Sequence, residues 1–98
     1  MQQKIKEFCK KHDLNHKPEH CALDLASEVG EVCKELLKMS DYGRKTLKFK
    51  QEVSEELGDA LYSLITLANS LNVDLEEALK KVLKKYEKRL KEKGNAGS

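Results

Sequence analysis

The sequence predicts an all-α protein, an antiparallel bundle of about four helices that folds as one domain. Three observations support this prediction. The 98 residues suffice for one domain but not for two. Charged residues make up 37% of the chain and hydrophobic residues 39%, with one proline and no tryptophan, which is a composition typical of amphipathic helices. Apolar residues also recur with a period of about 3.6 along three long segments, which is the repeat of an α-helix.

The first half of the chain contains two predicted helices. Residues 2–12 are rich in lysine and place Ile5 and Phe8 on one apolar side. Pro18 is tolerated in the first turn of a helix and therefore marks the start of the second one, which extends to about Met39. Its apolar residues follow helical spacing: Ala22, Leu25, Ala26, Val29, Val32, Cys33 and Leu36.

The second half of the chain contains two further predicted helices. A connecting loop over residues 40–48 precedes a helix over residues 49–71. Asp74 has the properties of a helix N-cap, and Glu77 three residues later completes a capping-box pattern. The fourth helix then continues to about Glu92. Short connections between long amphipathic helices favour antiparallel packing of neighbours.

The chain is expected to form a single domain over residues 1–93, followed by a glycine-rich flexible tail over residues 94–98. A net charge of +2 favours neither nucleic acid nor a membrane surface as a partner. No segment approaches the ~20 apolar residues of a membrane span. The three cysteines contain no CxxC pair, which suits free thiols in a reducing compartment, so we expect a cytoplasmic protein.

The most informative feature is an internal repeat of acidic residues. The segment SEVGEVCKELL at residues 27–37 resembles EELGDALYSLI at residues 55–65, and the two segments align without a gap. In this alignment Glu28, Gly30 and Glu31 match Glu56, Gly58 and Asp59. Acidic residues three positions apart lie on the same face of a helix, about one turn from each other.

This repeat predicts a site for a divalent metal ion. Both acidic pairs lie on the same flank of the apolar stripe of their helix, so packing the two stripes together brings Glu28, Glu31, Glu56 and Asp59 close to one another. Without a counter-charge, such a cluster is repulsive and raises carboxyl pKa values. Mg²⁺ prefers oxygen ligands and binds through a few carboxylates together with substrate phosphates.

A solvated acidic surface is the alternative interpretation, because twelve glutamates in a helical chain produce such spacings by chance. The matching glycines favour the metal site. Each acidic pair encloses a mid-helix glycine, which costs about 1 kcal/mol relative to alanine. Gly30 and Gly58 would permit the close approach of another helix or a ligand.

The same residues resemble those of the MazG-like all-α nucleotide pyrophosphohydrolases, whose hallmark is an ExxE pair on one helix and an ExxD pair on the next. The resemblance extends from about Phe8 to Arg89, and the segment LGDALYSLITLANSLNVDLEEALKKVLKKYEKRL is similar to the second acidic helix and the closing helix of the family. His16-Lys17-Pro18 resembles the His-x-Pro of the dCTP pyrophosphatase branch. The resemblance implies a MazG-like fold.

The resemblance also implies an activity. A nucleoside triphosphate would be hydrolysed between its α and β phosphates, which releases the monophosphate and pyrophosphate. The four carboxylates would hold Mg²⁺, with Mn²⁺ as a substitute, and Glu31 is the preferred candidate for the general base. Leu83 departs from the family pattern at a position that often carries asparagine, which puts the choice of substrate in doubt.

Four further residues are candidates for binding the substrate. His16 would contact the base, by resemblance. Lys85 and Arg89 are spaced to contact phosphates, although a solvated basic face explains them equally well. Tyr62 could stack on a base, but a structural role is favoured for it.

We therefore expect a Mg²⁺-dependent nucleoside triphosphate pyrophosphohydrolase that acts as a homodimer or homotetramer and removes non-canonical or excess dNTPs. The alternatives are a phosphoribosyl-ATP pyrophosphohydrolase and a helical interaction module without enzymatic activity. A di-iron carboxylate bundle is disfavoured, because neither acidic helix has the Glu-x-x-His spacing of such sites. The sequence leaves open the preferred base and sugar, the choice between dimer and tetramer, and the number of metal ions.

Overall fold

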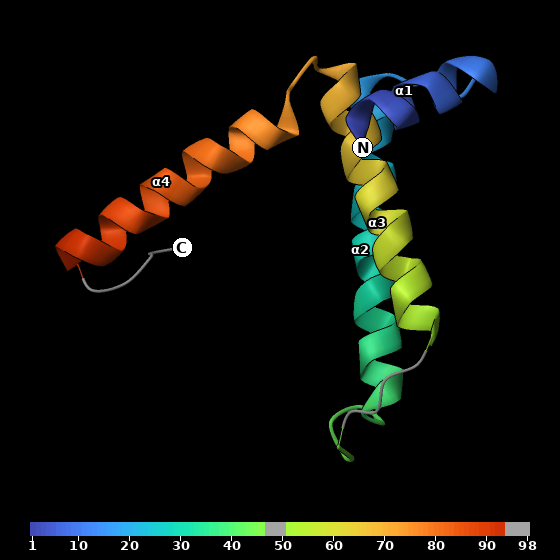
Figure 1. Ribbon diagram of the computed structural model, residues 1–98. Coiled ribbons are helices and arrows are strands. Elements are labelled where there is room, and N and C mark those ends of the chain that lie inside the picture. The colour runs from blue at the N-terminus through green and yellow to red at the C-terminus, as the bar shows by residue number, and fades with distance from the viewer. Residues whose placement is uncertain (47–50, 94–98) are drawn as a thin grey trace.

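The computed structural model describes residues 1–46 and 51–93, and its regular structure within these ranges is entirely helical (Figure 1). The helices are α1 (Gln2–Lys11), α2 (Pro18–Met39), α3 (Gln51–Ser70) and α4 (Leu75–Lys93). The prediction of an all-α fold with four helices is confirmed. The predicted start of the third helix at Phe49, part of the predicted 40–48 loop and the predicted 94–98 tail lie outside the described residues.

The centre of the fold is the antiparallel pair of α2 and α3, which lie side by side, with α1 across one end (Figure 1). The pair buries only part of the apolar stripe on each helix: Val53 and Ala68 of α3 are buried, whereas Val29, Leu36 and Leu57 are 48%, 39% and 53% exposed. The core that results is small. Its buried side chains are Cys9, Cys21, Met39, Val53, Ser63, Ile65 and Ala68.

Short-range hydrogen bonds define the end of α2 and the start of α4. The hydroxyl of Ser40 donates to the Leu36 or Leu37 carbonyl oxygen at 3.3 Å and accepts a bond from the Gly43 amide at 3.1 Å. These contacts end α2 and begin the turn that follows it. At the start of α4 the Glu77 amide donates to Asp74 Oδ1 at 3.2 Å, which confirms the predicted N-cap.

Helix α4 does not complete a compact bundle within the single chain. It projects away from α2 and α3 and makes only sparse contact with them (Figure 1). The radius of gyration is 16.7 Å, whereas a compact domain of this length has a radius of about 13 Å. Among the helices of residues 1–46 and 51–93, therefore, only α2 and α3 show the extensive antiparallel packing that was expected of the bundle.

Candidate metal centre

Three of the four predicted carboxylates converge between α2 and α3. Glu28 on α2, with Glu56 and Asp59 on α3, each place one carboxylate oxygen within 4.8 Å of the others. Glu28 and Glu56 are half-buried and Asp59 is exposed, so the cluster is open on one side. Oxygen ligands bound ~2.1–2.6 Å from one cation lie at most roughly 5 Å apart. The donor set and its spacing therefore fit a single hard divalent cation.

The electrostatics of this cluster favour binding of a cation. Partial loss of solvent around Glu56 raises its pKa above the ordinary value of 4.5, and the negative charges of Asp59, Glu28, Glu31 and Glu35 raise it further. In the described part of the chain, the ion pairs on α2 involve other carboxylates, those of Asp24 and Glu35. A divalent cation would relieve the repulsion and lower the same pKa.

Glu31 lies beside the cluster but not in the group of three. It is exposed and sits one turn further along α2 than Glu28, yet its charge still raises the pKa of Glu56. The half-buried Glu35, which pairs with Lys38 at 3.7 Å, contributes to the same field from one turn beyond. Glu31 therefore acts on the cluster through its charge, while its carboxylate remains in contact with solvent.

The glycines beside the acidic pairs face open space. A Cβ atom added at Gly30 or Gly58 would meet nothing within 4 Å, apart from chain neighbours and the backbone of the same helix. The expectation that they allow another helix to approach is therefore not met within the described part of this chain. Gly30 and Gly58 lie two positions after Glu28 and Glu56, so at about 100° per residue they face a different side of each helix from these two carboxylates.

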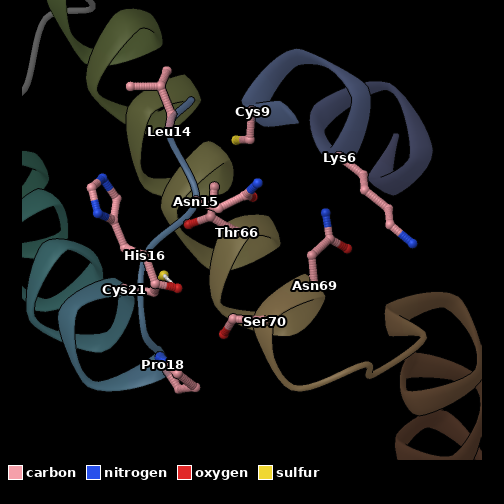
Figure 2. Close-up of a pocket in the computed structure, with 10 residues that line it drawn as sticks. All are labelled: Lys6, Cys9, Leu14, Asn15, His16, Pro18, Cys21, Thr66, Asn69 and Ser70. Atoms are coloured by element: carbon pink, nitrogen blue, oxygen red, sulfur yellow. Dashed lines mark hydrogen bonds between the residues drawn. The ribbon is translucent and has the colours of Figure 1, made fainter. Parts of the chain in front are cut away.

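His16 lies at a separate pocket, at the end of the helix pair where α1, the start of α2 and the end of α3 meet (Figure 2). The His16 ring stacks on His20 with 4.3 Å between the ring centres. The cavity has a volume of about 200 Å³ and is lined by Lys6, Cys9, Leu14, Asn15, His16, Pro18, Cys21, Thr66, Asn69 and Ser70. Sequence reasoning missed this pocket, because polar side chains from three separate segments form it.

The pocket and the acidic cluster lie along the same helix pair. Cys21 precedes Glu28 by seven residues, and Thr66 follows Asp59 by seven residues. At a rise of about 1.5 Å per residue, this places the pocket roughly 10 Å from the cluster along the helix axes. A ligand that reached both places would have to extend over about two helical turns.

Tyr62 belongs to the contact between α1 and α3. Its hydroxyl lies 3.4 Å from Cys9 Sγ, and the Phe8 ring meets its ring edge-on at a centre distance of 6.2 Å. The hydrogen bond with Cys9 and burial raise the pKa of Tyr62 to about 12. This geometry supports the structural role that the sequence favoured for Tyr62.

Lys85 and Arg89 are not brought to the acidic cluster of their own chain. Both flank the Tyr86 ring, with Lys85 Nζ 5.2 Å and Arg89 Cζ 6.0 Å from its centre. They lie on the outer part of α4, which extends away from α2 and α3 (Figure 1). A contact between these cations and a ligand at the cluster therefore needs a different arrangement of chains.

Comparison with known proteins finds a matching domain family and a similar solved structure. The MazG nucleotide pyrophosphohydrolase domain matches residues 16–93. The crystal structure of the Bacillus-conserved MazG protein, a nucleotide pyrophosphohydrolase, is 32% identical in sequence and superimposes with a TM-score of 0.73, covering 88% of this chain and 84% of that one.

Two curated proteins are also similar. The uncharacterized protein YpjD of Bacillus subtilis is 39% identical over 72 residues, which are 70% of this chain and 63% of YpjD. The nucleoside triphosphate pyrophosphohydrolase/pyrophosphatase MazG of Thermotoga maritima is 45% identical over 47 residues, which are 48% of this chain and 18% of that protein. The chain thus spans less than two thirds of the length of either relative.

The fold and the cluster together define an all-α protein with a candidate divalent-metal site between two antiparallel helices. The matched domain covers most of the chain, including both acidic pairs and α4. The chain belongs to the MazG nucleotide pyrophosphohydrolase family.

Proposed function

We propose that this protein is a Mg²⁺-dependent nucleoside triphosphate pyrophosphohydrolase, which converts a (d)NTP into the (d)NMP and pyrophosphate. The observation that carries the proposal is the convergence of Glu28, Glu56 and Asp59 on facing helices of a MazG-family domain. A cluster of like charges is unfavourable unless a cation or a proton compensates it. Triphosphates are commonly bound with Mg²⁺, which a few carboxylates and the phosphate oxygens hold together.

The roles of the residues follow from their positions. Glu28, Glu56 and Asp59 would hold the metal, with Glu31 as a fourth ligand or as the general base. When bound, Mg²⁺ neutralises charge on the phosphate oxygens, and Mn²⁺ could replace it because both accept oxygen ligands. Glu31 suits the general base because it is solvent-exposed beside the cluster and can take a proton from the attacking water.

The pocket at His16 supports the assignment of the substrate class. Its distance of roughly 10 Å from the cluster along the helices suits a nucleotide whose phosphates lie at the metal and whose base lies near His16. Its amide and hydroxyl groups can form hydrogen bonds with the edge of a base. Removal of non-canonical or excess dNTPs is the role we propose for such an activity.

We further propose that the protein acts as a homodimer or homotetramer in the cytoplasm. The exposed apolar residues of α4 favour association, because a helix with such a stripe is stabilised by covering it. All three cysteines are free thiols, which suits a reducing compartment. None of the helices in residues 1–46 and 51–93 is both long and apolar enough to cross a bilayer.

The direct test is pyrophosphate release from a panel of canonical and modified dNTPs and from phosphoribosyl-ATP. Malachite-green detection with added inorganic pyrophosphatase, with Mg²⁺, Mn²⁺ or EDTA, measures it. We expect metal-dependent pyrophosphate from at least one dNTP. Turnover of phosphoribosyl-ATP alone would assign the protein to that activity, and no pyrophosphate from any substrate would contradict the proposal.

A further inference from the structure

The pocket at His16 has one wall that α3 forms alone. Thr66, Asn69 and Ser70 lie on the same side of this helix, three or four positions apart, and all three are half-buried. The segment that contains Asn15 crosses opposite them (Figure 2). A ligand in this pocket therefore meets the polar groups of α3 along one of its edges.

The two hydroxyl groups of this wall are available to a ligand as hydrogen-bond acceptors. Thr66 Oγ1 donates its hydrogen to the Ser63 carbonyl oxygen at 2.8 Å, and Ser70 Oγ donates to the Leu67 carbonyl oxygen at 2.6 Å. A hydroxyl group has one hydrogen and two lone pairs. A ligand that needed a donor here would have to break one of these bonds, whereas a ligand that supplies N–H groups leaves both intact.

The third polar group of the wall, the amide of Asn69, is held in one orientation. Its Nδ2 donates to the Gln2 backbone carbonyl oxygen at 3.2 Å, and its Oδ1 accepts a bond from Gln2 Nε2 at 3.0 Å. A carbonyl oxygen can only accept, so turning the amide over would lose both bonds. These bonds leave Asn69 one N–H and one lone pair for a ligand. Discrimination between a donor and an acceptor therefore rests on the two hydroxyl groups.

The spacing of these hydroxyl groups suits a single amino group. Residues four positions apart on a helix, such as Thr66 and Ser70, have Cβ atoms about 5–6 Å apart. The two N–H bonds of an aromatic amino group diverge, so they reach two acceptors roughly 5 Å apart at ordinary hydrogen-bond lengths. A ring carbonyl group in the same place would set a third acceptor against the two hydroxyl oxygens, with no hydrogen between them.

The rest of the pocket suits a flat ring. Leu14, Pro18 and the buried side chains of Cys9 and Cys21 supply apolar surface for its faces. On the α1 side Lys6 adds an N–H donor, which suits an acceptor atom elsewhere on the ring. The volume of about 200 Å³ is below the ~300–1,000 Å³ of pockets that enclose drug-sized ligands. The pocket therefore holds one part of a nucleotide, such as its base.

We propose that Thr66 and Ser70 are specificity-determining residues, which select a base with an exocyclic amino group over the same base with an oxo group. The assignment rests on the proposed function, which makes the ligand a nucleotide. Cytosine and adenine carry such an amino group, and uracil and hypoxanthine carry an oxygen in its place. The protein therefore acts on nucleotides such as dCTP and dATP and discriminates against the deaminated dUTP and dITP. Removal of excess dNTPs fits this selection, whereas removal of deaminated dNTPs does not.

Binding of the product monophosphates tests this selection without turnover. Isothermal titration calorimetry in Mg²⁺ compares dCMP with dUMP and dAMP with dIMP, two pairs in which an oxo group replaces the amino group. We expect the amino member of at least one pair to bind about tenfold more tightly, because a site built to accept hydrogen bonds rejects an analogue that cannot donate them. Equal affinity within both pairs, tighter binding of the oxo members, or no binding of any monophosphate would overturn the proposal.

Substitution of the two hydroxyl residues locates the selection in this pocket. Thr66→Val and Ser70→Ala each remove one acceptor and should lower the ratio of the two affinities, whereas Thr66→Ser keeps the hydroxyl group and should preserve it. Ser54→Ala is the control, because Ser54 is exposed on the same helix and outside the pocket. The ratio is measured within one variant, so a general loss of stability does not imitate a change in selection. An unchanged ratio in both Thr66→Val and Ser70→Ala would contradict the roles assigned here.

Pyrophosphate release separates this proposal from the proposed function. Selective binding of the amino monophosphates without release from any dNTP would contradict the proposed function and support the selection. Release with equal kcat/KM for dCTP and dUTP and for dATP and dITP would support the function and overturn the selection.

Discussion

At the scale of single residues, Glu56 is the centre of the electrostatic strain in this protein. It is half-buried between two helices and surrounded by four other carboxylates that raise its pKa. The same surroundings that make its charge unfavourable in the free protein would favour a bound cation. Metal binding would favour the charged form of Glu56, whereas the stability of the metal-free fold favours the uncharged form.

Glu56→Gln should abolish most of the activity and stabilise the metal-free protein. The amide removes a metal ligand, and we expect kcat/KM to fall by at least about 100-fold. It also removes a charge that four neighbours repel, so the melting temperature in EDTA should rise. Glu55→Gln is the control, because Glu55 is exposed and outside the cluster. An active Glu56→Gln variant would show that this carboxylate is not a ligand.

The metal-free protein should lose stability as the pH rises through the raised pKa of Glu56. The folded protein binds this proton more tightly than the unfolded chain does, so protonation stabilises the fold. The contribution is complete below the ordinary value of 4.5 and disappears above the folded pKa. Urea unfolding in EDTA over this pH range measures it. Glu56→Gln should not show this contribution, and parallel curves for both proteins would contradict the assignment.

At the scale of elements, α2 and α3 each carry a mid-helix glycine that weakens the helix and is not required by packing inside the chain. Nothing in the described part of the chain lies within 4 Å of an added Cβ at either position, chain neighbours and the backbone of the same helix aside. The glycines therefore keep the helix surface at their own positions open. Replacing these glycines can therefore test helix stability and ligand access separately.

Gly30→Ala and Gly58→Ala should each stabilise the free protein by up to about 1 kcal/mol, because alanine has the higher helix propensity. For a chain of this size the melting temperature would rise by roughly 4–8 °C per kcal/mol. Urea unfolding and pyrophosphate release measure the two effects. If a ligand fills the space, activity falls although stability rises. A loss of stability would instead indicate that another helix packs there in solution.

At the scale of the whole molecule, the chain is extended and divided by charge. Its radius of gyration exceeds that of a compact domain because α4 projects from the helix pair. The acidic cluster and the basic α4 of one chain stay apart. Contact between the two would require a second copy, which the proposed homodimer would supply.

Two inactive variants should therefore restore activity when they are mixed. We expect Glu56→Gln and Arg89→Ala each to be inactive alone, because one alters the proposed metal site and the other a candidate phosphate contact that a second copy would have to supply. After mixing and refolding, random pairing makes half of the dimers mixed, and each mixed dimer has one intact site. Pyrophosphate release should recover to about one quarter of the wild-type rate. If both residues act within the same chain, no activity returns.

The sequence by itself determined the local features of this protein. Periodic apolar residues predict the helices, and Asp74 predicts an N-cap that the structure confirms. The repeated acidic pairs predict a cluster of four carboxylates, of which Glu28, Glu56 and Asp59 converge in the structure. These features depend on contacts one turn apart or on the packing of two neighbouring helices. Helical spacing is sufficient to specify them.

Only the tertiary structure decided how these elements are placed. The side chain of Gln2 on α1 bonds to Asn69, Val73 and Leu75 at the corner between α3 and α4, which lie 67–73 positions away along the chain. The pocket at His16 combines three segments, and Tyr62 meets Cys9 across 53 positions. Such contacts leave no periodic pattern in the sequence, because they arise where helix ends meet and depend on the angles between the helices.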